Sequence, residues 1–217
     1  MEKKEYYRRE LPHFQQPGQS YFVTWNLKDA VPAKALVNYK LQIIQLKQEL
    51  EMAQFRKVQK ETIAEINKKI YHARKKYMGA FDDLLDVQKK PKIDLSKPEI
   101  TSTIADTLHF WEKKRIDNYA FCIMPNHVHW VLHVYEKDVN NKPVYLQDIL
   151  HSIKSFTALK INEIENLKGA FWQDESFDTT IRDQQHLFRA IDYTIMNPVK
   201  AGLVDNWLAW KGTWCEF

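Results

Sequence analysis

Two histidines stand two residues apart near the middle of the chain. His127 and His129 begin a segment with an apolar run at 130–132, as expected of a strand. On a strand both side chains point to one face, roughly 6–7 Å apart along the chain. Two imidazoles at that spacing can take two cis positions on one metal ion. The alternative is a pair of half-buried strand histidines held by hydrogen bonds. His133 lies on the same face, but Val131 interrupts the series, so we expect His133 to be structural.

A tyrosine and an asparagine form the second half of this constellation. Tyr193 and Asn197 are four residues apart in a helical segment, so they share one face about one turn apart. A tyrosine with a pKa near its reference value of about 10 is a poor nucleophile. It becomes useful where a metal polarises the electrophile. The amide oxygen of Asn197 could join the two histidines as a third ligand. The alternative is a half-buried helix tyrosine and an asparagine that ends the helix before Pro198.

The residues around both sites resemble one protein family. The strings MPNHVHWVL at 124–132 and DYTIMNPVKAGLV at 192–204 resemble the HUH single-tyrosine transposases, and within them the REP-associated tyrosine transposases. Further similar segments are PHF at 12–14, YFVT at 21–24, DDLLD at 82–86, PEI at 98–100, SIKSFT at 152–157, FWQDESFD at 171–178 and IRD at 181–183. The similarity covers most of the chain and is weakest over residues 46–76.

This resemblance implies a site and a reaction. It implies that His127, His129 and Asn197 bind a metal and that Tyr193 is the catalytic nucleophile, although relatives have glutamine or another polar residue where Asn197 stands. The implied reaction nicks single-stranded DNA next to a hairpin formed by a repeat palindrome. Tyr193 attacks the phosphorus, a 5′-phosphotyrosine forms and the 3′-hydroxyl leaves, so that no nucleotide cofactor is needed. The metal would be Mg²⁺ or Mn²⁺: imidazoles favour Mn²⁺, and phosphate oxygens and water make Mg²⁺ workable.

Other residues are candidates for contacts with nucleic acid. Lys154 and Arg182 could contact phosphates, or simply carry surface charge. Trp172 could stack on an unpaired base, which contributes about 1–3 kcal/mol, or belong to the core. His186 lies two turns before Tyr193 and could assist proton transfer. Members of the wider family form dimers, and the sequence leaves both a homodimer and a monomer open.

The order of expected elements defines the fold class. Strands are expected at 21–27, 119–124, 127–135 and 177–181, and helices at about 96–114, 146–165 and 184–197, with Pro125–Asn126 as a tight turn. This order predicts an α+β fold: a ferredoxin-like antiparallel sheet (β-α-β-β-α-β) with helices on one face. The last helix, which carries Tyr193, is an appendage.

A long insertion follows the first strand. Residues 33–78 contain neither glycine nor proline and have helical composition, with two apolar stripes separated by a polar stretch near 56–60. Either one very long helix or an antiparallel pair fits. Its excess of lysine and arginine is typical of a solvated helix face or of a basic arm along a phosphate backbone. We predict a single domain over residues 1–217, with a helical insertion at about 33–88.

Composition excludes several protein classes. The net charge of +4 permits a nucleic-acid partner without arguing for one. Cys122 and Cys215 have neither metal-ligand spacing nor a disulfide framework, so we expect the reducing cytoplasm. The sequence predicts neither a signal peptide nor a membrane-spanning segment.

The sequence does not fit two other classes of enzyme that use closely spaced histidines. A histidine-triad nucleotide hydrolase needs a third histidine where Val131 stands. A zinc amidohydrolase needs a barrel of eight strand–helix units, which this chain cannot supply. The alternative that stays open is a domesticated DNA-hairpin-binding protein with little or no catalytic activity.

Overall fold

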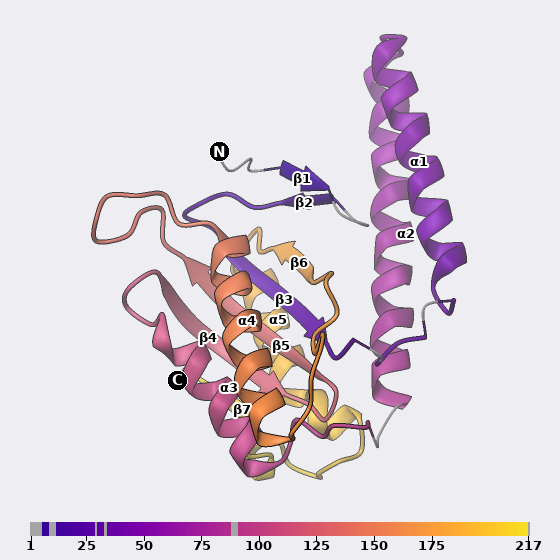
Figure 1. The fold of residues 1–217 in the computed structure, drawn as a ribbon. Coiled ribbons are helices and arrows are strands. Elements are labelled where there is room, and N and C mark those ends of the chain that lie inside the picture. Colours follow the sequence, from indigo (N-terminus) through magenta and orange to yellow (C-terminus); the bar gives the residue numbers. More distant parts are fainter. Residues whose placement is uncertain (1–5, 9–11, 29, 33, 88–90, 217) are drawn as a thin grey trace. The chain divides into compact units, whose positions relative to one another are not determined.

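The chain divides into two compact units. The computed structural model describes residues 6–8, 12–28, 30–32, 34–87 and 91–216. The first unit, here the α/β unit, comprises Met1–Lys28 and Lys90–Phe217, and the second, the helical unit, comprises Asp29–Lys89 (Figure 1). That the two act as a single domain stays a prediction.

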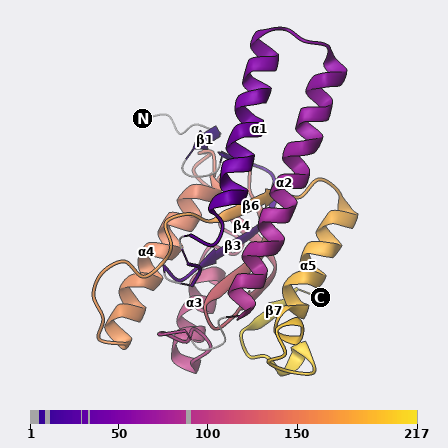
Figure 2. The ribbon, with the colours of Figure 1, turned by 90° about the vertical axis from the view of Figure 1, so that its right-hand side faces the viewer.

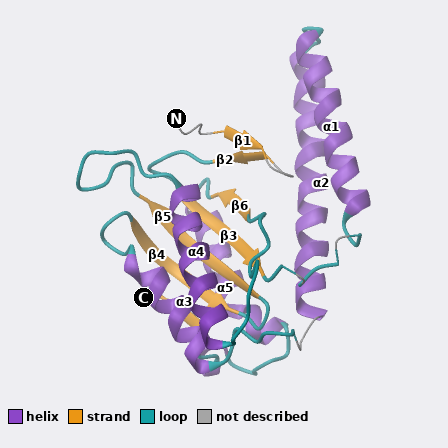
Figure 3. Ribbon diagram, in the orientation of Figure 1, coloured by secondary structure: helices purple, strands orange, loops and turns teal. Residues whose placement is uncertain are grey.

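The α/β unit contains one five-stranded antiparallel sheet. Its strand order is β6 (Phe177–Thr180), β3 (Ser20–Asn26), β5 (His127–Val134), β4 (Ile116–Ile123) and β7 (Thr213–Cys215). Helices α3 (Pro98–Phe110) and α4 (Leu146–Ile164) cover one face, and α5 (Gln184–Lys200) lies on the other (Figures 2 and 3). The chain order β3-α3-β4-β5-α4-β6 confirms the predicted ferredoxin-like fold with an appended helix.

Both faces of β5 are buried because helices cover the sheet on both sides. Towards α3 and α4, Trp130 packs edge-on against Trp25, which packs in turn against Trp172, with ring centroids 6.1 and 6.2 Å apart. Towards α5, Val131 belongs to a cluster with Ala190 and its neighbours. The turn between β4 and β5 is closed by a hydrogen bond from Met124 N to the His127 carbonyl (2.9 Å), as the Pro125–Asn126 turn predicts.

Some elements differ from the sequence prediction. Helix α5 does not end near Asn197 but continues to Lys200, with Pro198 inside it. Proline removes one backbone donor and crowds the preceding turn, but Asn197 and Pro198 are both buried, so tertiary packing holds the helix together there. Strands β1 (Tyr6–Arg8) and β2 (Pro12–Phe14), the short helix η1 (Trp207–Ala209) and the edge strand β7 were not predicted.

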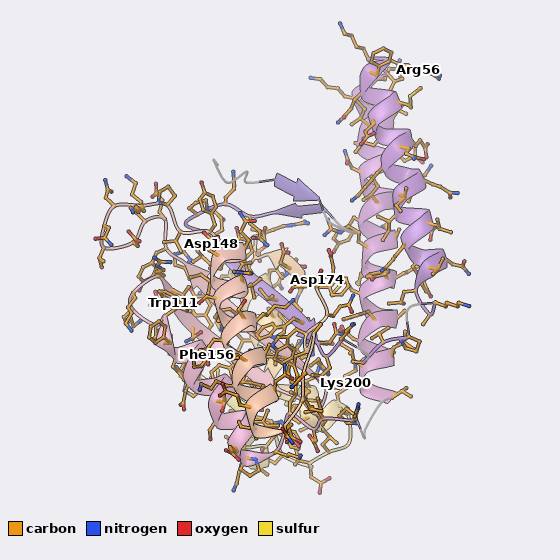
Figure 4. The ribbon with its side chains drawn as sticks, in the orientation of Figure 1. Arg56, Trp111, Asp148, Phe156, Asp174 and Lys200 are labelled. Carbon is orange, nitrogen blue, oxygen red and sulfur yellow. The ribbon has the colours of Figure 1, made fainter. Side chains whose placement is uncertain are left out.

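The helical unit is a hairpin of two helices. Of the two alternatives, the structure has the pair: α1 (Val37–Phe55) and α2 (Lys60–Val87) run side by side and antiparallel (Figure 2). Lys57 turns the chain with a positive φ of 51°. At this tip Phe55 is 83% exposed, and Arg56 stands beside it (Figure 4). The buried residues of the two helices are Ile43, Ala53, Ile66, Ala73, Tyr77, Phe81 and Leu85.

Among the described residues, no helix is both long and apolar enough to span a bilayer.

Candidate active site

The two histidines lie at one end of β5, on the sheet face covered by α5. Antiparallel pairing with β3 sets His127 opposite Asn26 and His129 opposite Thr24. Both imidazoles are fully buried, at 1% and 0% exposure. The same alternation directs Val128 and Trp130 to the other face. Two strands and a helix that are far apart in the sequence therefore meet at this site.

Each histidine ring is held at its Nδ1 atom. His127 Nδ1–H donates to Asn126 Oδ1 (2.6 Å), because an amide oxygen can only accept, and His129 Nδ1 bonds with Thr24 Oγ1 (2.8 Å). The two Nε2 atoms point at each other, 3.0 Å apart. His127 therefore presents a bare lone pair at Nε2. Fixing one ring nitrogen to orient the other is typical of metal-binding histidines.

Both imidazoles are held in the neutral form. Burial lowers the pKa of His127 to about 3, and the positive charge of Lys200 acts in the same direction. Burial also holds the pKa of His129 well below its usual value, with smaller effects from His127 and Lys200. Only neutral imidazole has a lone pair for a metal, so this environment suits a ligand.

Asn197 on α5 is the next side chain that lies close to these histidines. Its Nδ2 lies 3.1 Å from His129 Nε2, and its Oδ1 is buried with no hydrogen-bond partner. If His129 Nε2 carries a proton, it meets the Asn197 N–H donor; if not, it meets the lone pair of His127. With the amide in this orientation, either tautomer leaves one contact between like groups, which is unfavourable in a buried site.

A divalent cation fits this donor set. Rotating the Asn197 amide by 180° exchanges its nitrogen and oxygen and brings Oδ1 towards His129 Nε2. Two ligand atoms about 2.1 Å from a metal and at a right angle to each other lie about 3.0 Å apart, the separation of the two Nε2 atoms. Among the described residues there is no cluster of three His, Cys, Asp or Glu side chains. The third protein ligand would therefore be an amide oxygen.

Tyr193 lies beside His129 of its own chain. The two rings are 5.4 Å apart at 78°, and Phe22 stacks on His129 (5.6 Å) and meets the edge of Tyr193 (5.8 Å). Tyr193 is half-buried. Lys200 Nζ lies 5.6 Å from the centre of the Tyr193 ring, so a positive charge stands next to the phenol. The sequence-predicted residues His127, His129, Tyr193 and Asn197 are thus gathered in one place.

Helix α5 presents three of these side chains along one face. Asp183 caps its first turn by accepting from His186 N (2.7 Å), and Lys200 forms its last turn (Figure 4). Tyr193, Asn197 and Lys200 follow one another at intervals of four and three residues, the spacing of a single helix face. His186, which the sequence suggests for proton transfer, accepts from Arg182 N (3.3 Å) in the first turn.

The three residues predicted to contact nucleic acid, Lys154, Trp172 and Arg182, differ from one another in their surroundings. Lys154 Nζ donates to the carbonyls of Gln173 (2.6 Å) and Asp174 (3.0 Å) and to Ser176 Oγ (3.1 Å), so it ties a loop to α4. Trp172 is only 6% exposed, and its indole N–H donates to Thr157 Oγ1 (2.9 Å). It therefore has little free surface for a base in this structure. Arg182 is exposed.

Sequence reasoning assigned no role to four residues that contact or face this site: Thr24, Asn26, Asn126 and Lys200. Thr24 and Asn26 are found only through the pairing of β3 with β5. Asn126 precedes His127 in the motif, and Lys200 stands seven residues, or two helical turns, after Tyr193. The helical spacing could have indicated Lys200 beforehand.

Comparison with known proteins gives two similar proteins. A protein of Haemophilus influenzae named "Putative REP-associated tyrosine transposase" is 27% identical over 96 residues, which cover 41% of this chain and 53% of the relative. The chain thus matches about half the length of this relative. A solved structure, "Structure of the REP associates tyrosine transposase bound to a REP hairpin", has a TM-score of 0.47 and 16% identity over 98% of this chain and 82% of that one. No protein-family model matches the chain. The curated relative confirms the resemblance that the two motifs indicate.

Proposed function

We propose that this chain, which resembles the REP-associated tyrosine transposases, is a metal-dependent enzyme that nicks single-stranded DNA next to hairpins and transfers the cut strand. One observation carries the proposal. Two neutral imidazoles, a buried amide with an unpartnered oxygen and a half-buried tyrosine converge on one end of β5. This set joins a cation site to a nucleophile.

His127, His129 and Asn197 would hold the cation, which is Mg²⁺ or Mn²⁺. When bound, the cation supplies positive charge that polarises the phosphate and stabilises the charge developing on its oxygens. Thr24 and Asn126 orient the imidazoles through their Nδ1 atoms. Asn126 fixes the tautomer of His127, and the Thr24 hydroxyl can accept from His129 Nδ1, so that both Nε2 lone pairs can be directed at one point.

Tyr193 performs the chemical step. Its phenolic oxygen attacks the phosphorus, a bond from that oxygen to phosphorus forms, and the bond from phosphorus to the 3′-oxygen breaks. The phenol loses its proton and the departing 3′-oxygen gains one, which leaves a 3′-hydroxyl and a 5′-phosphotyrosine. A 3′-hydroxyl then attacks the phosphotyrosine and restores the phosphodiester. The energy of the broken bond is kept in the covalent intermediate, so the cycle needs no nucleotide cofactor.

Lys200 adds a fixed positive charge beside the nucleophile. Its ammonium group faces the Tyr193 ring and acts electrostatically on both histidines. A phosphate that reaches Tyr193 would therefore approach Lys200 as well. An ammonium group in that place stabilises the additional negative charge of the transition state.

The decisive experiment measures covalent attachment. The full chain is incubated with Mn²⁺ and hairpin-bearing single-stranded DNA from the flanks of its own gene, and a denaturing gel reveals any protein–DNA adduct. Tyr193→Phe should lower adduct formation by roughly 10³-fold or more while hairpin binding is nearly unchanged, because only the nucleophilic oxygen is lost. His129→Ala and a chelator should both abolish the adduct.

Tyr135→Phe is the matched control. It also removes one phenolic oxygen, but that hydroxyl donates to Asp117 (2.8 Å). We expect normal adduct formation from this variant. Full activity of Tyr193→Phe would refute the assignment of the nucleophile. Hairpin binding by the wild type with no adduct under any metal would instead support the alternative, a hairpin-binding protein with little activity, which no feature of the described residues favours.

A further inference from the structure

A second buried amide lies on the same face of the sheet as the histidines. Asn26 is 2% exposed, and its Oδ1 has no hydrogen-bond partner. A buried acceptor left unsatisfied is destabilising, and in folded proteins such an atom usually meets a water molecule or an ion. The functional roles proposed above leave this oxygen unused.

Strand pairing puts Asn26 next to His127. The two residues are directly opposite each other on β3 and β5. Leu27 N donates to the Asn126 carbonyl (2.9 Å), which makes Leu27 and Asn126 a hydrogen-bonded pair. Pairs alternate along an antiparallel ladder, so Asn26 and His127 form a non-hydrogen-bonded pair, the kind in which side chains approach most closely.

The amide of Asn26 is also held in one orientation. Its Nδ2 donates to the Leu27 carbonyl (2.7 Å). Because the N–H of Leu27 points towards β5, its carbonyl points there too, and the Asn26 amide that reaches it lies on the β5 side of β3. Rotating the amide would set Oδ1 against the carbonyl oxygen. The unpartnered Oδ1 therefore stays an oxygen, on the sheet face that carries His127.

We infer that Asn26 is a further residue of the metal site: its Oδ1 accepts hydrogen bonds from water bound to the cation that His127, His129 and Asn197 hold. This inference rests on the proposed function. Mg²⁺ and Mn²⁺ keep several water molecules when few protein ligands are present, and those waters need acceptors inside a buried site. The Asn26 oxygen is such an acceptor, fixed in place before the metal arrives.

The competing role for Asn26 is purely structural, as an anchor for Leu27 through Nδ2. Asn26→Asp separates the two roles. Aspartate keeps an oxygen towards the cation and adds a negative charge, but it loses the donor to Leu27. A metal-site residue predicts Mn²⁺ affinity at least equal to that of the wild type. A mere anchor predicts weaker Mn²⁺ binding, because aspartate loses the donor that holds Leu27 in place.

The test is Mn²⁺ affinity of the full chain without DNA, measured from the electron paramagnetic resonance signal of free Mn²⁺. We expect Asn26→Ala to weaken binding about tenfold or more, the usual loss for an outer partner of a metal site, and Asn26→Asp to bind at least as tightly as the wild type. Asn118→Ala is the matched control. Asn118 is also fully buried, but its amide bonds to Trp130 Nε1 (2.7 Å) and to the Leu108 carbonyl (3.3 Å), towards α3. This control should keep wild-type affinity.

The outcomes separate the inference from the function on which it rests. Wild-type affinity in Asn26→Ala, with binding lost in His129→Ala, overturns the inference and leaves the proposed function standing. If Asn26→Ala does not fold, weaker binding by Asn26→Asp than by the wild type overturns the inference instead. Absence of Mn²⁺ binding by the wild type, or its survival in His129→Ala, overturns both.

Discussion

The two units are built in opposite ways. In the α/β unit, β5 pairs with β3 more than 100 residues away, as in the contact of Thr24 with His129, and α5 adds Tyr193 and Asn197 from a third region. In the helical unit, α1 and α2 are neighbours in the sequence. The expected apolar stripe of α2 is buried, at Ile66, Ala73 and Tyr77, whereas α1 buries Ile43 and Ala53 and leaves Val37 and Leu41 of its expected stripe exposed. The first unit buries polar side chains such as those of His127, His129 and Asn197, whereas the second exposes Phe55 and many charged side chains.

This difference indicates where changes are tolerated. Burying an amide or an imidazole costs free energy unless a partner or an ion compensates. The buried histidines and amides of the α/β unit therefore indicate a functional role for these groups. A solvated helix pair needs no such compensation. We therefore expect chemistry and stability to depend on the α/β unit, and the helical unit to affect binding at most.

The largest contrast in stability should be between two substitutions, each of one aromatic residue, with one in each unit. Trp130 is fully buried and hydrogen-bonded to Asn118, so Trp130→Ala should lower the free energy of unfolding by about 3–5 kcal/mol. Phe55→Ala at the exposed tip should change it by less than about 0.5 kcal/mol. Urea unfolding of both variants measures the difference. A comparable loss for Phe55→Ala would mean that the tip is packed in solution.

Acid should destabilise the metal-free protein through the α/β unit. His127 and His129 have folded-state pKa values below the unfolded value of about 6.5, so the unfolded chain binds more protons in acid. Their contribution to stability is complete above pH 6.5 and is lost as the pH falls from there towards 3. Thermal melts in chelator over this range measure it. His127→Ala should flatten the pH dependence; an unchanged profile would mean that these histidines do not cause it.

The smallest effect should come from shortening the helical unit. We would replace residues 46–76 with a short Gly/Ser turn and measure melting and hairpin binding across salt concentrations. The helices pack on each other and the site residues lie elsewhere, so we expect the α/β unit to fold and both affinity and salt dependence to stay unchanged.

Two other results would change this view of the helical unit. An insoluble product would show that the insertion belongs to the core. A lower salt slope would show phosphate contacts, since each one lost reduces the log–log slope by about 0.7–0.9. In that case the basic residues to test are Arg56, Lys57, Lys60, Lys68, Lys69, Arg74, Lys75 and Lys76.

Local sequence patterns predicted the order of the strands and helices and the four residues that lie together at the site. The shared face of His127 and His129 follows from a two-residue period, and that of Tyr193 and Asn197 from a four-residue step. Asn26 could not be found in this way. Its place beside His127 depends on the register between β3 and β5, which the sequence of either strand alone does not specify.

The elements that were missed carry weak local signals. Strand β7 has three residues and exists because it pairs with the edge of β4. The extension of α5 past Pro198 depends on packing, since Asn197 and Pro198 are both buried. In both cases tertiary contacts outweigh local preference.

The alternation of side chains on β5 links correct folding to activity. Val128 and Trp130 face α3 and α4, while His127 and His129 face α5. A slip of one residue would exchange these faces, turning the tryptophan towards α5 and the imidazoles into the apolar layer. A mispaired molecule would lose its core and its reactive centre in the same event. The proposed DNA-cutting activity is thereby confined to chains that have reached the native register, and misfolded copies are harmless to the DNA around them.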